Sequence, residues 1–528
     1  MITVTYPVVS PAPVPDGLLA AFEAYETALL ANDVTTLDAL FAPGPDTVRG
    51  DGTALLVGHD AITRFRTART VIPTRRVAEL HVRPLGEDAA LLMASTVEPS
   101  NGATGLQTQL WQRFPDGWKV TAAHVSLPTK QAAAQPVVDP AVWRVVGTPL
   151  VPPTGSGLLD GVTVAVKDLF AVAGQPIGAG NPTWLAEQQA QPATAPAVAA
   201  LLAAGAEITG IARTDEFAYS LAGQNAHYGS APNPAVPGGI GGGSTSGPAA
   251  AVALDHVVVG LGTDTAGSIR VPASYQGLVG IRTTHDAVPR DGLVPLAPSF
   301  DTVGWLARTT GPVQRVAEVL LPGATGGAPK RTAVLPTAEG HASPDVATAC
   351  TDRRAALVAD GLLPAAEPAD LAPETVETWF AAFRTLQAFE AWAAHGEWIT
   401  AHPGALGADV AARFAAAAEV TPTQADDARG TVAEARTWLR ELLADAVLVL
   451  PSSAGGAPAR DASAETIEAE RAGTLRMSCL AGLAGAPAVS LPVLRTADGR
   501  PAGLCLVGAP GTDLDLLNLA HAIEGSTA

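Results

Sequence analysis

The sequence has few cysteines, little positive charge and no long apolar run. Its 528 residues include 3 cysteines, and 32 Lys and Arg residues stand against 51 Asp and Glu, giving a formal net charge of -19. This acidic excess excludes the electrostatic footprint that nucleic acid or an anionic membrane requires. The apolar stretch 249–261 is too short, and too interrupted by Asp255 and His256, to cross a bilayer. We therefore expect neither nucleic acid nor a membrane as a partner.

The cysteines and the N-terminus favour a cytoplasmic protein. The cysteines are odd in number, widely spaced and without neighbouring histidine pairs: Cys350, Cys479 and Cys505. A disulfide framework or a zinc site needs a different pattern, so we expect a reducing compartment, no metal and no cofactor. Residues 1–17 lack both the basic and the apolar segment of a secretory signal.

The chain is long enough for two or more domains, and its first part predicts an α+β domain. Over 1–127, residues at helical spacing are followed by four strand-like runs between turn signals, a pattern that predicts a curved sheet wrapped around a helix. The predicted elements are helices over 18–30, 35–42 and 58–66, then strands over 76–84, 89–97, 106–114 and 118–126.

A proline-containing stretch separates this domain from the rest. Residues 128–150 predict a semi-extended linker, because proline fixes its own φ and restricts the preceding residue. Over 151–528, short Val-rich strands alternate with helical stretches, which is typical of an α/β domain with a largely buried sheet. The predicted strands include Val162–Val166, Glu207–Ile211, Val257–Leu261 and Ala446–Leu450, and 340–445 is predicted to be almost entirely helical.

Three segments of the second domain combine dense glycines with serines and one lysine. They are 161–170 (GVTVAVKDLF), 238–247 (GGIGGGSTSG) and 260–272 (GLGTDTAGSIRVP). Glycine at this density indicates unusual backbone angles or close approaches. A flexible loop is one interpretation. A phosphate cradle is another, although the run lacks a P-loop ending and no GxGxxG turn follows the first strand. Neither interpretation explains the serines and the lysine.

These segments resemble the amidase-signature family, and the resemblance runs from about 151 to 521. The family's glycine–serine signature is matched by 242–247 (GGSTSG), and its nucleophile motif by 262–270 (GTDTAGSIR). Ser244 precedes Ser268 by 24 residues, as in the family, and Lys167 follows a Val/Ala strand at the position of the family's base. Residues 245, 246 and 248 depart from the usual pattern. The resemblance implies an α/β domain with a mixed twisted sheet covered by helices.

The resemblance also implies amide hydrolysis by a serine triad. Ser268 is the expected nucleophile, Ser244 the proton relay behind a cis peptide bond with Gly243, and Lys167 the base. A serine hydroxyl needs a base, and lysine is one only as a neutral amine, so burial must lower its pKa. Water would then hydrolyse the acyl-enzyme. The backbone N–H groups expected to form the oxyanion hole are those of Thr265, Ala266, Gly267 and Ser268.

Further side chains are candidates for the substrate pocket. Segments 178–184, 215–229 and 298–305 resemble the family branch that includes plant indole-3-acetamide hydrolases. Arg270 either forms an ion pair with Asp301 or holds a substrate carboxylate. The pocket candidates on these segments are Tyr219, Gln224, Asn225, Tyr228 and Phe300. Two residues have other expected roles, Ser246 as a structural hydrogen-bond donor and His227 as an alternative base.

The first domain, over 15–127, resembles the AtzH-like group of the SnoaL-like, nuclear-transport-factor-2-like superfamily. The resemblance rests on the helix around Tyr25 and on 46–51 (DTVRGD), 58–62 (GHDAI) and 118–126 (WKVTAAHVS). It implies a cone in which Tyr25 and Arg49 face an internal cavity, where an arginine matches a carboxylate or ureido group. AtzH-like proteins are associated with carboxylated ureas and accompany amidases. The alternative is a cone that only mediates dimerisation or stabilises its neighbour.

Three functions are compatible with the sequence. The first is hydrolysis of a small linear carboxamide or ureido acid, releasing ammonia, by a cytoplasmic homodimer. The second is an aryl-acetamide amidase with an accessory N-terminal domain. The third is a non-catalytic, amidase-like receptor or subunit, and the presence of Ser268, Ser244 and Lys167 argues against it.

Overall fold

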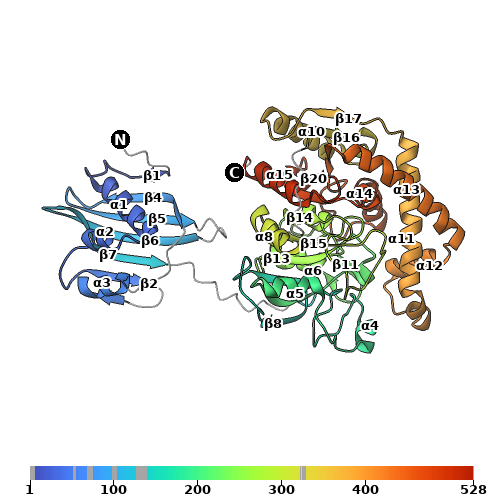
Figure 1. Ribbon diagram of the computed structural model, residues 1–528, viewed down its shortest axis with the longest axis horizontal. Coiled ribbons are helices and arrows are strands. Elements are labelled where there is room, and N and C mark those ends of the chain that lie inside the picture. The colour runs from blue at the N-terminus through green and yellow to red at the C-terminus, as the bar shows by residue number, and fades with distance from the viewer. Residues whose placement is uncertain are drawn as a thin grey trace. The chain divides into compact units, whose positions relative to one another are not determined.

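The chain folds into two units, Met1–Gln135 and Pro136–Ala528, which we describe separately (Figure 1). The structure is a computed structural model. The residues that it describes are 6–51, 55–67, 75–97, 104–126, 139–321, 323 and 329–526.

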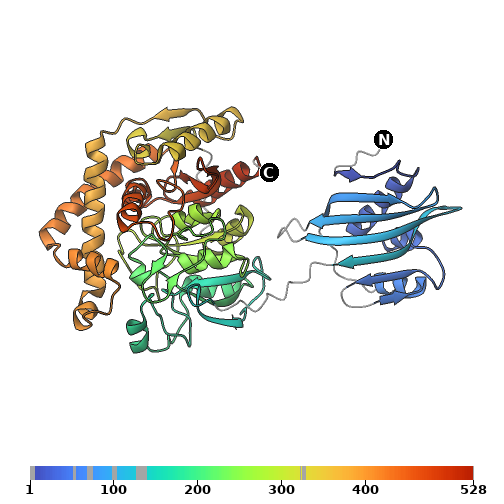
Figure 2. The same ribbon diagram turned by 180° about the vertical axis from the view of Figure 1, so that it is seen from behind.

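The first unit is a seven-stranded sheet packed on helices, in the order β1-β4-β5-β6-β7-β2-β3. Helix α1 (Leu18–Ala31) buries Phe22 and Tyr25, at helical spacing, against sheet residues that include Trp111 and Val120. Figures 1 and 2 show the helices over one face of this sheet. The other elements are β1 (Val8–Val9), α2 (Val34–Leu40), β2 (Val48–Asp51), β3 (Leu55–Val57), α3 (His59–Thr67), β4 (Arg76–Pro84), β5 (Ala89–Val97), β6 (Thr104–Phe114) and β7 (Gly117–Ser126).

The predicted α+β architecture of this unit is present. All three predicted helices and the four predicted strands occur within a few residues of their expected bounds. The sequence pattern missed β1, β2 and β3, which are 2, 4 and 3 residues long. Strands this short carry too little alternation of apolar and polar residues to be recognised.

The second unit is built on an 11-stranded mixed sheet in the order β17-β16-β18-β20-β19-β14-β15-β13-β9-β10-β8. Its central strands carry apolar side chains on both faces and are fully buried, as the Val-rich runs predicted. The strands are β8 (Trp143–Val151), β9 (Thr163–Lys167), β10 (Glu207–Ala212), β13 (Val259–Asp264), β14 (Val279–Arg282), β15 (Thr302–Ala307), β16 (Arg331–Val334), β17 (Ala366–Pro368), β18 (Ala446–Pro451), β19 (Ala488–Arg495) and β20 (Pro501–Val507), with a separate hairpin of β11 (Gln224–Asn225) and β12 (Gly229–Ser230).

Helices cover this sheet, and the long α11 (Pro373–Ala401) stands at one side of the unit with α12 (Ala408–Ala418) and α13 (Pro422–Leu443) beside it (Figure 1). A capping box between Thr421 and Gln424 starts α13. The remaining helices are α4 (Pro182–Glu187), α5 (Pro196–Ala203), α6 (Ser246–Ala253), α7 (Arg270–Gln276), α8 (Thr310–Leu320), α9 (Pro336–Glu339), α10 (Pro344–Ala359), α14 (Ala464–Ala484) and α15 (Asp513–Gly525), with a 3-10 turn at Glu216–Ala218.

Two sequence expectations for the second unit need correction. The predicted linker over 128–150 extends too far, because β8 pairs antiparallel with β10 as the edge strand of the large sheet. Residues 127–138 lie outside the described residues. The segment 340–445 is helical as predicted, except that β17 interrupts it and pairs parallel with β16. An edge strand can tolerate proline, so the prolines around β8 did not prevent its pairing.

Candidate active site

The sheet brings the three glycine-rich segments together at one edge. Strands β9 and β13 are parallel neighbours, so their carboxyl ends lie side by side. Lys167 is the last residue of β9, and Ser268 lies on the loop between β13 and α7. Ser244 lies two residues before α6, and its peptide bond with Gly243 is cis, as the resemblance implied. All three side chains are buried.

Two positions at this edge require glycine, one because of its backbone angle and one because of a close contact. The density of glycine in the sequence predicted both reasons. Gly242 has a φ of 71°, in the left-handed region that favours glycine. At Gly262, on β13, an added Cβ would lie 2.3 Å from Cγ2 of Thr245. Strand and signature loop can approach this closely only because position 262 has no side chain.

Lys167 is held by three hydroxyl groups. Its Nζ lies 2.8 Å from Ser244 Oγ, 2.8 Å from Thr263 Oγ1 and 3.2 Å from Thr245 Oγ1. Thr245 donates its own proton to the carbonyl of Thr263 at 3.2 Å, so its oxygen is left to accept from the lysine. A neutral amine has two N–H donors and one lone pair. The arrangement therefore suits an amine that donates to the two threonines and accepts from Ser244.

Burial gives Lys167 the pKa that a base needs. Removal from water lowers the pKa of this lysine to about 7, against the opposing effects of Asp215, Asp264 and Asp301. An ordinary lysine is almost entirely charged at neutral pH. Here a large fraction is a neutral amine, able to take a proton from a hydroxyl.

Asp264 organises the loop that carries Ser268. Its carboxylate accepts hydrogen bonds from the backbone N–H of Gly267 at 2.8 Å and of Ile269 at 3.2 Å. It also accepts from the guanidinium groups of Arg270 and Arg282. These arginines hold the pKa of the buried Asp264 carboxyl well below its usual range. Asp264 lies within the nucleophile motif, but the motif alone predicts no role for it.

This loop changes the expected oxyanion hole. The N–H of Gly267 already donates to Asp264, so it is not available to an oxyanion in this conformation. Thr265 and Ala266 line a narrow cavity of about 10 Å³ together with Ser268. The backbone donors that remain as candidates are those of Thr265, Ala266 and Ser268. Within the described part of the chain, the Ser268 hydroxyl has no hydrogen-bond partner.

Asp215 supports the signature loop from the other side. Its buried carboxylate accepts from Ser246 Oγ at 2.9 Å and from the N–H of Gly223 at 2.9 Å. The structural hydrogen bond predicted for Ser246 is therefore present. His227, the alternative base, contacts Glu216 at 2.8 Å rather than the triad.

The five residues predicted to line the substrate pocket do not all line one cavity. Tyr219 and Gln224 line a cavity of about 840 Å³, and Tyr219 also lines the narrow space at Ser268. The other three have scaffold contacts and line neither space. Asn225 donates to the carbonyls of Gly180 and Thr214, Tyr228 lies under the guanidinium of Arg213, and Phe300 is buried against Phe383.

The ion pair predicted between Arg270 and Asp301 is not present. The buried guanidinium of Arg270 pairs with Asp264 at 2.9 Å, and this pairing leaves its role as a substrate contact a prediction. Asp301 instead accepts from Thr265 Oγ1 and from the backbone N–H of Leu296. Arg270 begins α7, which turns its side chain back onto the end of β13.

The candidates of the first unit are both buried. Tyr25 accepts a hydrogen bond at 2.9 Å from Arg66, a residue that no sequence motif indicated. The guanidinium of Arg49 lies 4.4 Å from the centre of the Phe65 ring. The interior of this unit thus contains two arginines near aromatic rings.

A Gly262→Ala variant tests the close contact between β13 and the signature loop. The new Cβ would displace Thr245, to which Lys167 donates, so we expect a loss of about 1–3 kcal/mol of stability and a lower kcat. Thermal unfolding and steady-state kinetics measure the two effects. Gly430→Ala is the matched control, because its Cβ meets nothing within 4 Å on α13, and alanine there should stabilise the helix. Equal behaviour of both variants would contradict the contact.

Comparison with known proteins agrees with this geometry. Residues 153–379 match the family model described as Amidase, and residues 8–131 match the model described as AtzH-like. Amidase 1 of Arabidopsis thaliana is 33% identical over 417 residues, which cover 69% of this chain and 93% of that protein. The chain belongs to the amidase family. It is an amide-hydrolysing enzyme of the amidase-signature type with an N-terminal AtzH-like domain.

Other relatives of the amidase carry either the same name or a different one. Amidase 1 of Oryza sativa subsp. japonica is 34% identical over 70% of this chain and 91% of that protein. Outer envelope protein 64, chloroplastic, of Arabidopsis thaliana is 43% identical over only 32% of this chain and 29% of its own length. Sequence similarity over a shorter stretch is thus shared with a protein of another name.

Solved structures also resemble the amidase. A crystal structure of an amidase superposes with a TM-score of 0.63 and 29% identity, covering 70% of this chain and 85% of the other. A structure described as an unexpected vestigial protein complex that reveals the origins of an s-triazine catabolic enzyme gives a TM-score of 0.67 and 25% identity, with coverage of 76% and 94%. The mixed sheet covered by helices is therefore the amidase fold.

The structure adds observations on the cysteines, on the apolar helices and on groups of metal-ligating side chains. Cys350, Cys479 and Cys505 are all free and buried. In the part of the chain that the structure describes, no helix is long and apolar enough to span a membrane. Over the same residues, no group of three His, Cys, Asp or Glu side chains is arranged to hold a metal ion.

Proposed function

We propose that the amidase hydrolyses a small linear carboxamide or ureido acid through an acyl-enzyme on Ser268. The observation that carries the proposal is the buried Lys167 within 2.8 Å of Ser244, at the end of a strand whose neighbour leads into the Ser268 loop. Lys167 acts as the base, and Ser244 passes the proton between Ser268 and the lysine.

The first half of the reaction forms the ester and releases ammonia. Ser268 Oγ attacks the amide carbonyl while its proton moves to Ser244, whose own proton moves to Lys167. The carbonyl oxygen takes up negative charge, which the N–H groups of Thr265, Ala266 or Ser268 stabilise; such a donor typically contributes about 3 kcal/mol to catalysis. The proton then returns through Ser244 to the amide nitrogen, the C–N bond breaks and ammonia leaves.

The second half restores the enzyme. Water attacks the acyl–Ser268 ester and gives its proton to Ser244, which again passes one to Lys167. Collapse of the intermediate breaks the ester bond, and the proton returns to Ser268 Oγ. The products are ammonia and a carboxylic acid, or ammonia and a carbamic acid when the substrate is a ureido acid.

The acyl group is the open part of the proposal. A ureido acid is favoured by the AtzH-like domain, whose buried Tyr25 and Arg49 suit a carboxylated urea. An aryl-acetamide is the second candidate, because segments 178–184, 215–229 and 298–305 resemble the family branch that includes indole-3-acetamide hydrolases. A cytoplasmic location and a homodimer belong to the same proposal, with the AtzH-like domain as the candidate dimerising element.

Ammonia release from a substrate panel tests the proposal. Purified full-length enzyme is incubated with simple carboxamides, ureido acids and indole-3-acetamide, and ammonia is measured by a coupled assay. We expect hydrolysis of at least one class and, after rapid quenching, a mass increase on the peptide that contains Ser268. Ammonia release without any covalent intermediate on Ser268, even with hydroxylamine as a trap, would contradict the acyl-enzyme.

A further inference from the structure

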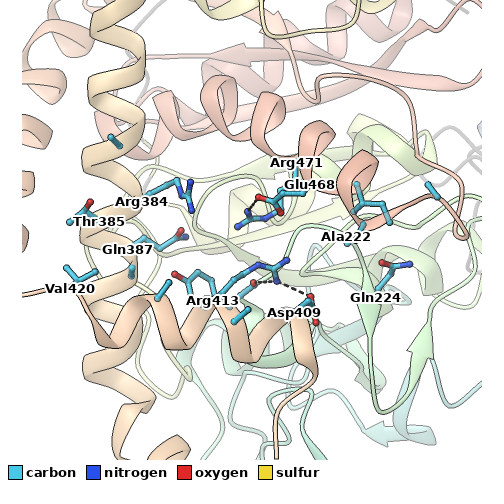
Figure 3. Close-up of a pocket in the computed structure, with 18 of the residues that line it drawn as sticks. Ala222, Gln224, Arg384, Thr385, Gln387, Asp409, Arg413, Val420, Glu468 and Arg471 are labelled. Carbon is cyan, nitrogen blue, oxygen red and sulfur yellow. Dashed lines mark hydrogen bonds and ion pairs between the residues drawn. The ribbon is translucent and has the colours of Figure 1, made fainter. Parts of the chain in front are cut away.

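A large cavity beside the triad is lined by arginines, and we call it the arginine chamber. It has a volume of about 840 Å³ and lies between α11, α12, α14 and the segment around 219–224 (Figure 3). The narrow space at Ser268 shares three lining residues with it, Tyr219, Gln387 and Arg471. Because Ser268 lines the narrow space, a substrate held there would extend its far end into the chamber.

Positive charge exceeds negative charge in the arginine chamber. Asp409 pairs with Arg413 at 3.1 Å, and Glu468 pairs with Arg471 at 2.9 Å. Two more arginines, Arg384 and Arg460, line the chamber, and no further Asp or Glu is among its described lining residues. The full charged lining is Arg384, Arg413, Arg460, Arg471, Asp409 and Glu468. This local excess occurs in a chain whose net charge is -19.

Three of these guanidinium groups point into one space. Figure 3 shows Arg384, Arg413 and Arg471 directed toward one another from α11, α12 and α14. Burial lowers the pKa of Arg471, and the charges of Arg413 and Arg384 lower it further. The same three arginines oppose the rise in the pKa of the buried Tyr219. Mutual repulsion of this kind is relieved by an anion.

Arg471 has a donor that is not used within the protein. Its side chain is 12% exposed, and its N–H at Nη1 donates to Glu468 at 2.9 Å. Its Nε is buried and has no hydrogen-bond partner among the described residues. A buried donor without a partner costs free energy, which a ligand oxygen recovers when it accepts that bond. Since Arg471 lines both cavities, such a ligand would reach toward Ser268.

We propose that the arginine chamber binds a carboxylate of the substrate, so that the amidase prefers short amides whose acyl part ends in a carboxylate, with Arg471 as the specificity-determining contact. The inference rests on the proposed amide hydrolysis and names its substrate class. A guanidinium presents a planar set of donors that matches a carboxylate. Two chemical sources share this feature, the monoamides of dicarboxylic acids and the ureido acids.

Matched amides test the preference. We compare kcat/KM for succinamate and for its uncharged methyl ester, and likewise for N-carbamoylglycine and its methyl ester. The wild type is expected to favour the anion of at least one pair by tenfold or more. In Arg471→Gln, that preference should fall by about 10- to 100-fold, mainly through KM. The pair that shows the preference identifies the source of the carboxylate.

Two further variants make the kinetic test specific. Arg471→Lys keeps the charge without the planar fork and should restore the preference only in part. Arg331→Gln removes an exposed arginine paired with Asp445 outside the chamber, and it should keep the wild-type preference. If Arg471→Gln does not fold, Arg384→Gln replaces it, because Arg384 is exposed and lines the same chamber. Equal kcat/KM for anion and ester in the wild type would overturn the inference.

A binding measurement separates this inference from the proposed function. Succinate binding to the Ser268→Ala enzyme is measured by calorimetry, with and without Arg471→Gln. We expect Kd to rise at least tenfold when Arg471 is lost, whether or not any amide is hydrolysed. If succinate binds equally to both proteins, or to neither, the chamber does not hold a carboxylate. Failure of the acyl-enzyme experiment alone would leave this outcome unchanged.

Discussion

Replacing Ser268 with alanine is expected to lower kcat/KM for amide hydrolysis at least about 10⁴-fold, because it removes the hydroxyl on which the proposed acyl-enzyme forms. The fold should persist. Ser268 makes no side-chain hydrogen bond among the described residues, and its side chain is buried, so the substitution removes one small polar group without leaving a partner unsatisfied. Steady-state ammonia release and the thermal midpoint measure the two expectations.

A matched control keeps this result specific to the nucleophile. Ser343 precedes α10, and its hydroxyl makes no capping bond to the helix backbone but donates to Asp345 at 2.7 Å, remote in sequence from the triad. Ser343→Ala removes this one hydrogen bond, so it should retain activity and cost about 1 kcal/mol of stability. A Ser268→Ala enzyme that keeps more than a few per cent of wild-type activity would assign the nucleophile to another residue.

The sequence predicted the buried strand that carries Lys167 and the close backbone contacts at glycine, because both depend on residues that are neighbours in the chain. The short Val- and Ala-rich run before Lys167 predicted a buried strand, which is β9. Lys167 is the last residue of this strand, and its burial lowers its pKa. The density of glycine predicted that backbone segments approach each other closely, and the contact between Gly262 and Thr245 is such an approach. A buried sheet was expected from alternating strands and helices, and its mixed strand directions were expected from the family resemblance.

The partners of charged side chains could not be predicted in the same way. Arg270 and Asp301 carry opposite charges in neighbouring motifs, and the sequence therefore predicted an ion pair between them. In the structure β13 ends at Asp264, and α7 turns Arg270 back onto this carboxylate. Asp264 thereby receives bonds from two arginines and two or more backbone N–H groups, which no spacing rule shows. The predicted donor at Gly267 was lost for the same reason.

The arginine chamber lies beyond any local signal. Its arginines come from α11, α12, α14 and a loop, separated by long stretches of helix. Each residue by itself resembles an ordinary exposed charge on a helix. These arginines form one surface only because the helices that carry them pack around the opening to Ser268. Substrate class therefore depends on tertiary structure, whereas reaction type can be predicted from a motif.

The pH dependence of the amidase should follow the protonation of Lys167. Burial lowers the pKa of this lysine to about 7. In the proposed mechanism only the neutral amine, 2.8 Å from Ser244 Oγ, accepts the proton that leaves Ser268. Activity should therefore be low in acid, rise through about pH 7 and level off above it, falling up to about tenfold for each pH unit below the pKa. A kcat/KM profile between pH 5 and pH 9, taken with a substrate that does not titrate in this range, measures the midpoint of this rise.

Lys167→Met removes the base while keeping a chain of similar length in the same apolar surroundings. We expect kcat/KM to fall at least about 10³-fold and the remaining activity to lose the midpoint near neutrality. Lys330→Met, at a position outside the triad, should keep the wild-type profile. A wild-type midpoint two or more units above 7 would mean that Lys167 stays charged in the working enzyme, and the proton from Ser268 would then need a different acceptor.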